Sequence, residues 1–79
     1  MLPFAVYCWH YLTEGWEARN AQLIRLAGRR PDTNCAGSGV YELVWYVATV
    51  PEAEDLRDLL RVIPGVTTEA DWGLAQRKN

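Results

Sequence analysis

The two cysteines and the single histidine are the residues of this chain with the most distinctive chemistry. Cys8 and His10 lie two positions apart in PFAVYCWHYLTEGW, Pro3 to Trp16, and Cys35 lies far downstream. On a strand, residues two apart point to the same face, which suits a shared metal ion or a thiolate activated by an imidazole. A structural zinc site needs four ligands, and a cysteine nucleophile needs an oxyanion loop and an oriented base. The sequence shows neither pattern, so we predict no enzyme, no metal and no cofactor.

Length and composition indicate a small acidic domain. The chain has 79 residues, of which 49% are hydrophobic, with four tryptophans and a formal net charge of −2. A chain of this length forms one domain, residues 1–79, with a thin margin of stability. Lys78 is the only lysine. Because neutralisation of phosphate dominates nucleic-acid affinity, we expect no nucleic-acid partner.

The sequence indicates a cytoplasmic protein without a membrane segment. No apolar run approaches the roughly 20 residues that span a bilayer, and MLPFAVYCWHY lacks the basic region and cleavage site of a signal peptide. In a reducing compartment, Cys8 and Cys35 stay reduced, so we expect no bridge between them. The last residues, 73–79, are predicted to be a frayed tail.

Residue spacing predicts an alternation of strands and helices. We predict strands over three segments, 4–11, 40–50 and 66–72, and helices over two, 13–29 and 51–63. Thr13 is the expected N-cap of the first helix and Gly28 its end, and Pro51 fits the first turn of the second. Segment 32–39 is expected to be an edge strand or a loop.

Each predicted helix has an apolar stripe. On the first it consists of Trp16, Leu23, Ile24 and Ala27, with Arg19, Gln22 and Arg25 turned away. On the second it consists of Ala53, Leu56, Leu59, Leu60 and Ile63. These stripes predict that both helices pack against a sheet.

The element order, β-α-(β)-β-α-β with a doubtful second strand, points to an α+β fold. Helices between strands act as crossovers, so we expect parallel neighbours in an antiparallel or mixed sheet with both helices on one face. This pattern resembles the ferredoxin-like βαββαβ sandwich, the fold of RNA-recognition motifs and of ligand-binding ACT domains. LRVIPGV, Leu60 to Val66, resembles the turn before the last strand in several such families. Because the fold hosts many unrelated functions, it decides none.

Strand alternation divides the aromatic residues between two faces. We assign to the helix-covered face Phe4, Val6, Cys8, Leu43, Trp45 and Val47. The open face then carries Tyr7, Trp9, Tyr11, Val44 and Tyr46, with Thr67, Glu69 and Asp71 from the last strand. Tyrosine and tryptophan are common interface anchors, so this face is predicted to bind a partner or a second copy. The alternative is that a tail or a long loop covers it.

An RNA-recognition motif is the alternative from another functional class. GVYELVWY, Gly39 to Tyr46, matches the motif of its third strand at Tyr41, Val44 and Tyr46. It lacks the basic residue, and it has Glu42 in place of a small residue and Leu43 in place of a stacking aromatic. That alignment also turns Tyr41 and Leu43 to the open face. An ACT-like or RNA-recognition-like domain that binds a small ligand or nucleic acid therefore stays the alternative.

The second helix opens with an acidic patch of Glu52, Glu54, Asp55 and Asp58. These residues are predicted to complement the helix dipole and to pair with Arg57 and Arg61 at i+3 spacing, or to dock a basic protein. In size and charge the chain is similar to phage-encoded inhibitors of host machinery, including anti-CRISPR proteins. We therefore predict a non-enzymatic interaction module that binds another protein or forms a homodimer. The predicted partner-binding residues are Tyr7, Trp9, Tyr11, Tyr46, Glu52, Glu54 and Asp55.

Overall fold

Six elements make up the fold, and each one that the sequence predicts is present. The structure is a computed structural model that describes residues 3–71. The elements are β1 (Phe4–Tyr11), α1 (Trp16–Ala27), β2 (Thr33–Gly37), β3 (Val40–Val47), α2 (Val50–Leu60) and β4 (Val66–Asp71). The doubtful segment is thus an edge strand, whereas the predicted tail and Trp72 lie outside the described residues. Neither α1 nor α2 is long and apolar enough to cross a membrane.

The four strands form one antiparallel sheet in the order β2-β3-β1-β4. The expectation of parallel neighbours is wrong, because each helix connects two strands that are separated by a third. β3 lies between β1 and β2, and β1 lies between β3 and β4. The chain is therefore an α+β protein with two helices and a four-stranded antiparallel sheet, an architecture compatible with a ferredoxin-like fold.

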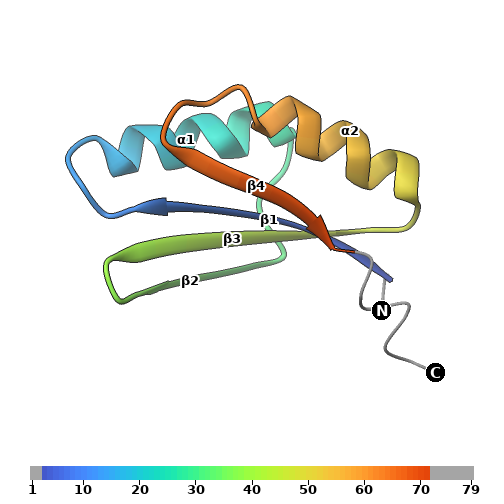
Figure 1. Ribbon diagram of the computed structural model, residues 1–79, viewed down its shortest axis with the longest axis horizontal. Helices are drawn as coiled ribbons and strands as arrows, with labels where there is room; N and C mark the ends of the chain where they lie inside the picture. The colour runs from blue at the N-terminus through green and yellow to red at the C-terminus, as the bar shows by residue number, and fades with distance from the viewer. Residues whose placement is uncertain (1–2, 72–79) are drawn as a thin grey trace.

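Both helices lie on the same side of the sheet, and the hydrophobic core fills the space between the two layers (Figure 1). The sheet contributes Val6, Cys8, His10, Leu43, Trp45 and Val47, and the helical layer contributes Leu23, Ala53, Leu60 and Ile63. Phe4 packs at the margin of this core. The predicted assignment of the covered face is therefore confirmed.

The prediction that Leu59 belongs to the apolar stripe of α2 is wrong, because this residue is 45% exposed. The helix contacts the sheet along Ala53, Leu56 and Leu60. Each helical residue is rotated by about 100° from the last, so Leu59 lies more than a quarter turn from Leu60. Ile63 is buried as predicted, but it follows the helix rather than belonging to it.

The helix starts differ from the predicted ones. Gly15, not Thr13, is the N-cap of α1, and as a glycine it has no side chain to cap the helix. The Thr13 hydroxyl is already engaged, because it accepts a hydrogen bond from the Arg19 guanidinium at 3.2 Å. Arg19, expected to turn away, also donates to the Tyr11 carbonyl at 2.9 Å. Gly28 ends α1 as predicted.

The start of α2 is capped by Thr49, which the sequence interpretation missed. The Thr49 hydroxyl accepts from the Glu52 N–H and donates to the Glu52 carboxylate, both at 3.2 Å. The Thr-x-x-Glu spacing of a capping box is visible in the sequence, but here the Glu52 carboxylate bonds the Thr49 hydroxyl and not the Thr49 N–H. Pro51 occupies the first turn as predicted.

We expect Trp45→Ala to unfold the domain or nearly so. The Trp45 side chain is fully buried in the core, and its Nε1–H donates to the Arg29 carbonyl at 3.1 Å. Truncation of a core aromatic costs about 3–5 kcal/mol of the free energy of unfolding. Urea titration followed by circular dichroism measures this loss. Tyr11→Ala is the control, since Tyr11 is 65% exposed. A loss for Trp45→Ala no larger than that of the control would contradict the core assignment.

Candidate functional site

The sheet face opposite the helices, called here the open face, carries the predicted aromatic residues. In the strand register, Trp9 lies between Thr67 on β4 and Glu42 on β3. Tyr7 lies one row away, between Glu69 and Val44. β2 adds Thr33 beside Val44 and Cys35 beside Glu42. The face thus combines aromatic rings with carboxylates and small polar groups.

The aromatic residues of the open face differ in exposure. Tyr11 is 65% exposed, whereas Tyr7, Trp9 and Tyr46 are half-buried. Val44, in the middle of the face, is only 5% exposed. Within residues 3–71, no helix lies over this side of the sheet (Figure 1). Half-buried rings on an uncovered sheet face are typical of an interface anchor.

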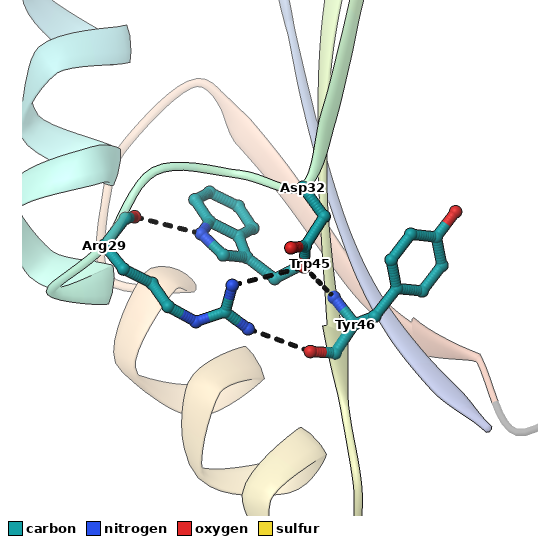
Figure 2. Close-up of polar contacts among 4 residues, drawn as sticks. All are labelled: Arg29, Asp32, Trp45 and Tyr46. Atoms are coloured by element: carbon teal, nitrogen blue, oxygen red, sulfur yellow. Dashed lines mark hydrogen bonds and ion pairs between the residues drawn. The ribbon is translucent and has the colours of Figure 1, made fainter. Parts of the chain in front are cut away.

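Tyr46 is held in place by two side chains from the segment between α1 and β2 (Figure 2). Its N–H donates to Asp32 Oδ2 at 2.7 Å, and its carbonyl accepts from Arg29 Nη2 at 2.8 Å. Arg29 and Asp32 also pair with each other at 3.2 Å. The two side chains therefore satisfy the backbone of Tyr46 as a neighbouring strand would. The Tyr46 ring points to the side of β3 opposite the Trp45 ring (Figure 2).

The acidic patch and the open face are separate surfaces. Glu54 and Asp55 are exposed on α2, which lies on the opposite side of the sheet, and Glu52 is engaged in the cap (Figure 1). The structure therefore does not bring together all the predicted partner-binding residues. It groups the four aromatic residues on one surface and the three carboxylates on another.

The expected i+3 pairing within α2 is wrong. Arg57 pairs at 3.0 Å with the adjacent Asp58. Arg61, which ends the helix, directs its Nε–H to the Thr68 carbonyl at 3.5 Å instead. Glu54 and Asp55 are thus exposed carboxylates close to the N-terminus of α2, where the helix dipole favours negative charge.

Cys8 and His10 share the covered face, as the spacing predicts, but both are buried there. The Cys8 thiol lies 3.4 Å from the Thr68 hydroxyl. Burial raises the pKa of Cys8 to about 11, an effect that the hydrogen bond to Thr68 opposes. His10 Nε2–H donates to Asn20 Oδ1 at 3.3 Å. A thiol with this pKa is a poor nucleophile at neutral pH.

Cys35 lies on the open face, a position that the sequence did not reveal because its strand was in doubt. It is exposed, and β3 separates its strand from that of Cys8. The two cysteines face opposite sides of the sheet and cannot bridge in this fold. Among residues 3–71, no three His, Cys, Asp or Glu side chains are grouped in a way that suits a metal ion.

The alignment with an RNA-recognition motif places two residues on the wrong face for this fold. Leu43 is fully buried under the helices. Tyr41 is on the same side of the sheet, where its ring stacks on that of Trp16 with 5.6 Å between the ring centroids. The centroid of the His10 ring lies 5.9 Å from that of Tyr41. Val44 and Tyr46 are the motif positions that lie on the open face.

Comparisons with protein-family models, with curated proteins and with solved structures found no match for this chain. The function is therefore inferred from the geometry of the open face.

We expect Asp32→Asn to weaken the fold in a pH-dependent way. The Tyr46 N–H, aided by Arg29, holds the pKa of Asp32 below its ordinary value of 3.8. A lowered pKa means that the carboxylate stabilises the fold above that ordinary value, and that this contribution is lost as the pH falls through the folded-state pKa. Urea midpoints measured from neutral to acid pH should differ most from wild type at neutral pH.

Asp58→Asn is the matched control for Asp32→Asn. Asp58 also pairs with an arginine, but among residues 3–71 no backbone N–H bonds its carboxylate. We expect no measurable change for this exposed pair. Equal effects of the two variants, or an Asp32→Asn effect independent of pH, would show that the link to Tyr46 does not stabilise the fold.

The two thiols are expected to react very differently. At pH 8, Ellman's reagent should modify Cys35 at once and Cys8 only after unfolding, since Cys35 is exposed and Cys8 is buried. The unfolded Cys8 thiol loses its proton near pH 9, whereas the folded thiol keeps it to about 11. Its contribution to stability is therefore lost as the pH rises between these values. If both thiols of the native protein reacted with the reagent equally fast, the result would contradict the burial of Cys8.

Proposed function

We propose that this protein is a non-enzymatic interaction module that binds another protein through its open face. The observation that carries the proposal is the position of Trp9. This half-buried tryptophan lies in a row between Thr67 and Glu42, with Tyr7 and Tyr11 on the same strand face. The few residues that dominate the binding energy of a protein interface are enriched in tryptophan and tyrosine, and they lie near its centre.

The architecture supports a ferredoxin-like assignment. Each of the two helices crosses from one strand to another that is separated from it by a single strand, in the order β2-β3-β1-β4. We infer that the chain is a βαββαβ sandwich with one face covered and one face left for recognition. Since this fold serves many functions, the assignment itself names no partner.

The charges on the open face favour a partner with a basic surface. Glu42 lies beside Trp9 and Glu69 lies beside Tyr7, and both carboxylates are exposed. An arginine of the partner would meet a carboxylate and an aromatic ring together, through an ion pair and a cation–π contact. The exposed Glu54 and Asp55 lie on α2, on the opposite side of the sheet, and form no part of this surface. In its sharpest form, the proposal is an inhibitor that occupies a basic surface of a host protein.

The chemistry of the covered face supports a binding role rather than catalysis. The Cys8 thiol is buried and its pKa is about 11, so it is protonated at neutral pH. His10 is bonded to Asn20 beneath the helices. The reactive side chains of the opening segment thus belong to the core.

We expect Trp9→Ala to lose the partner while the domain stays folded. Truncation of an interface anchor costs about 2 kcal/mol or more, which is about a 30-fold loss of affinity. Wild type, Trp9→Ala and Leu59→Ala would each be immobilised and exposed to extract of the source cell, and the retained proteins quantified by mass spectrometry. Leu59 is the matched control, because it is an exposed apolar residue on the helical side.

Loss of a specific protein from Trp9→Ala, with retention by Leu59→Ala, is the expected result. Circular dichroism must show the same helical content in all three proteins. Equal retention by Trp9→Ala would contradict the proposal. Retained material that disappears after nuclease treatment and falls steeply with salt would favour the RNA-recognition alternative.

A further inference from the structure

Within residues 3–71, no strand pairs with the backbone groups along the outer edge of β2. The Leu12 N–H donates to the Gly39 carbonyl at 2.8 Å, so Gly39 directs its backbone toward the β1 side. Backbone direction alternates along a strand. The backbone N–H and C=O groups of three β3 residues therefore point toward β2: those of Val40, Glu42 and Val44. The 2.8 Å bond from the Asp32 N–H to the Val44 carbonyl agrees with this direction.

This alternation determines which residues of β2 direct their backbone N–H and C=O groups away from β3. Cys35 is opposite Glu42, so its N–H and carbonyl point inward to β3. The same holds for Thr33 and Gly37, opposite Val44 and Val40. Asn34 and Ala36 then direct their N–H and C=O groups away from the sheet. β2 is the edge strand of the sheet (Figure 1), so these four groups point away from β3.

The residues of β2 lack the charges and prolines that usually prevent strands from pairing. Its five residues, TNCAG, are all exposed, and they include no charge, proline or bulky side chain. The other edge, β4, differs in two respects. It carries Glu69 in mid-strand, and the Arg61 side chain lies over its outward Thr68 carbonyl at 3.5 Å. Charges and side chains of this kind block edge-to-edge association.

We propose that β2 pairs antiparallel with β2 of a second copy of this chain, about a two-fold axis at Cys35. In this register Asn34 lies opposite Ala36 of the partner copy, and the two such pairs exchange four N–H···O=C bonds. Cys35 lies opposite Cys35 of the partner copy in a non-hydrogen-bonded pair, where Cα atoms are about 4.5 Å apart. The two four-stranded sheets become one sheet with both open faces on the same side.

Symmetry favours a second copy over an unrelated peptide. The two outward residues lie one on each side of Cys35, the central residue of β2, so self-pairing uses all four groups without a shift of register. The side chains that meet are small, with Thr33 opposite Gly37 and Asn34 opposite Ala36. The nearest carboxylate on the open face is Glu42, on the next strand. Its two copies lie three strand spacings apart, roughly 14 Å, beyond the Debye length at physiological salt.

This dimer does not rest on the function proposed above, because it uses backbone groups at the sheet edge and leaves the aromatic rings accessible. It would present two open faces side by side, and a partner with two binding sites would gain avidity from them.

Amide exchange measured by NMR at several protein concentrations tests the proposal. The measurements use Cys35→Ser, which prevents a disulfide and keeps a side chain of similar size. We expect the Asn34 and Ala36 N–H groups to exchange roughly tenfold more slowly at the highest concentration than at the lowest. The outward N–H groups of the other edge, at Val66 and Ala70, are the internal control and should not change.

A substitution gives a second, independent measurement by sedimentation. In the Cys35→Ser background, Ala36→Pro removes one outward N–H and leaves the bonds to β3 intact, as proline is tolerated on edge strands. Ala36→Ser keeps the N–H and is the matched control. We expect Ala36→Ser to dimerise and Ala36→Pro to stay monomeric, and Trp9→Ala to dimerise like the background. If circular dichroism shows that Ala36→Pro is unfolded, Asn34→Pro replaces it.

Three results would overturn the proposal. The first is a monomer at every concentration, with no change in the exchange of Asn34 and Ala36. The second is undiminished association of a folded Ala36→Pro variant, which would place the contact elsewhere. The third is loss of association in Trp9→Ala, which would assign self-association to the open face.

Discussion

Two helices cover one face of a four-stranded sheet, and this constraint determines the role of almost every strand residue. Side chains alternate along a strand, so an aromatic-rich strand must send half of its rings to the side without helices. Cys8 and His10 are buried for this reason, and Tyr7 and Trp9 lie on the open face for the same reason. The density of aromatic residues in the opening segment thus serves a core and a surface at once.

A set of hydrogen bonds around Trp45 connects the covered face of the sheet with the open face. The Trp45 indole fills the core and bonds to the Arg29 carbonyl, while the Arg29 side chain and Asp32 hold the backbone of Tyr46 (Figure 2). The exposed ion pair between Arg29 and Asp32 contributes little by itself. Its effect comes from satisfying the N–H and the carbonyl of Tyr46, which lies on β3 beyond the first residue of β2 and so has no β2 residue opposite it. The segment between α1 and β2 therefore positions a core residue and an open-face residue together.

Much of this arrangement follows from the sequence, because alternation and helical spacing are local patterns. They predict the covered face and the four aromatic residues of the open face. The strand state of β2 could not be predicted from TNCAG, which has no hydrophobic alternation. It depends on pairing with β3 through a turn in which Ser38 and Gly39 both have positive φ, 55° and 77°. Without β2, the face of Cys35 and the role of Asp32 were also out of reach. The prediction of parallel neighbouring strands is wrong because the order of strands in a sheet depends on tertiary packing, which local sequence patterns do not specify.

Within residues 3–71, one face of the sheet is core and the other is free of helices, and we expect this second face to be accessible to solvent. Hydroxyl-radical footprinting with mass spectrometry measures this directly, since it reports side-chain oxidation in the native protein. We predict rapid oxidation of Tyr11, measurable oxidation of Trp9 and Tyr46, and protection of Trp45 until the protein unfolds. Protection of Trp9 and Tyr46 equal to that of Trp45 would instead show that the open face is covered.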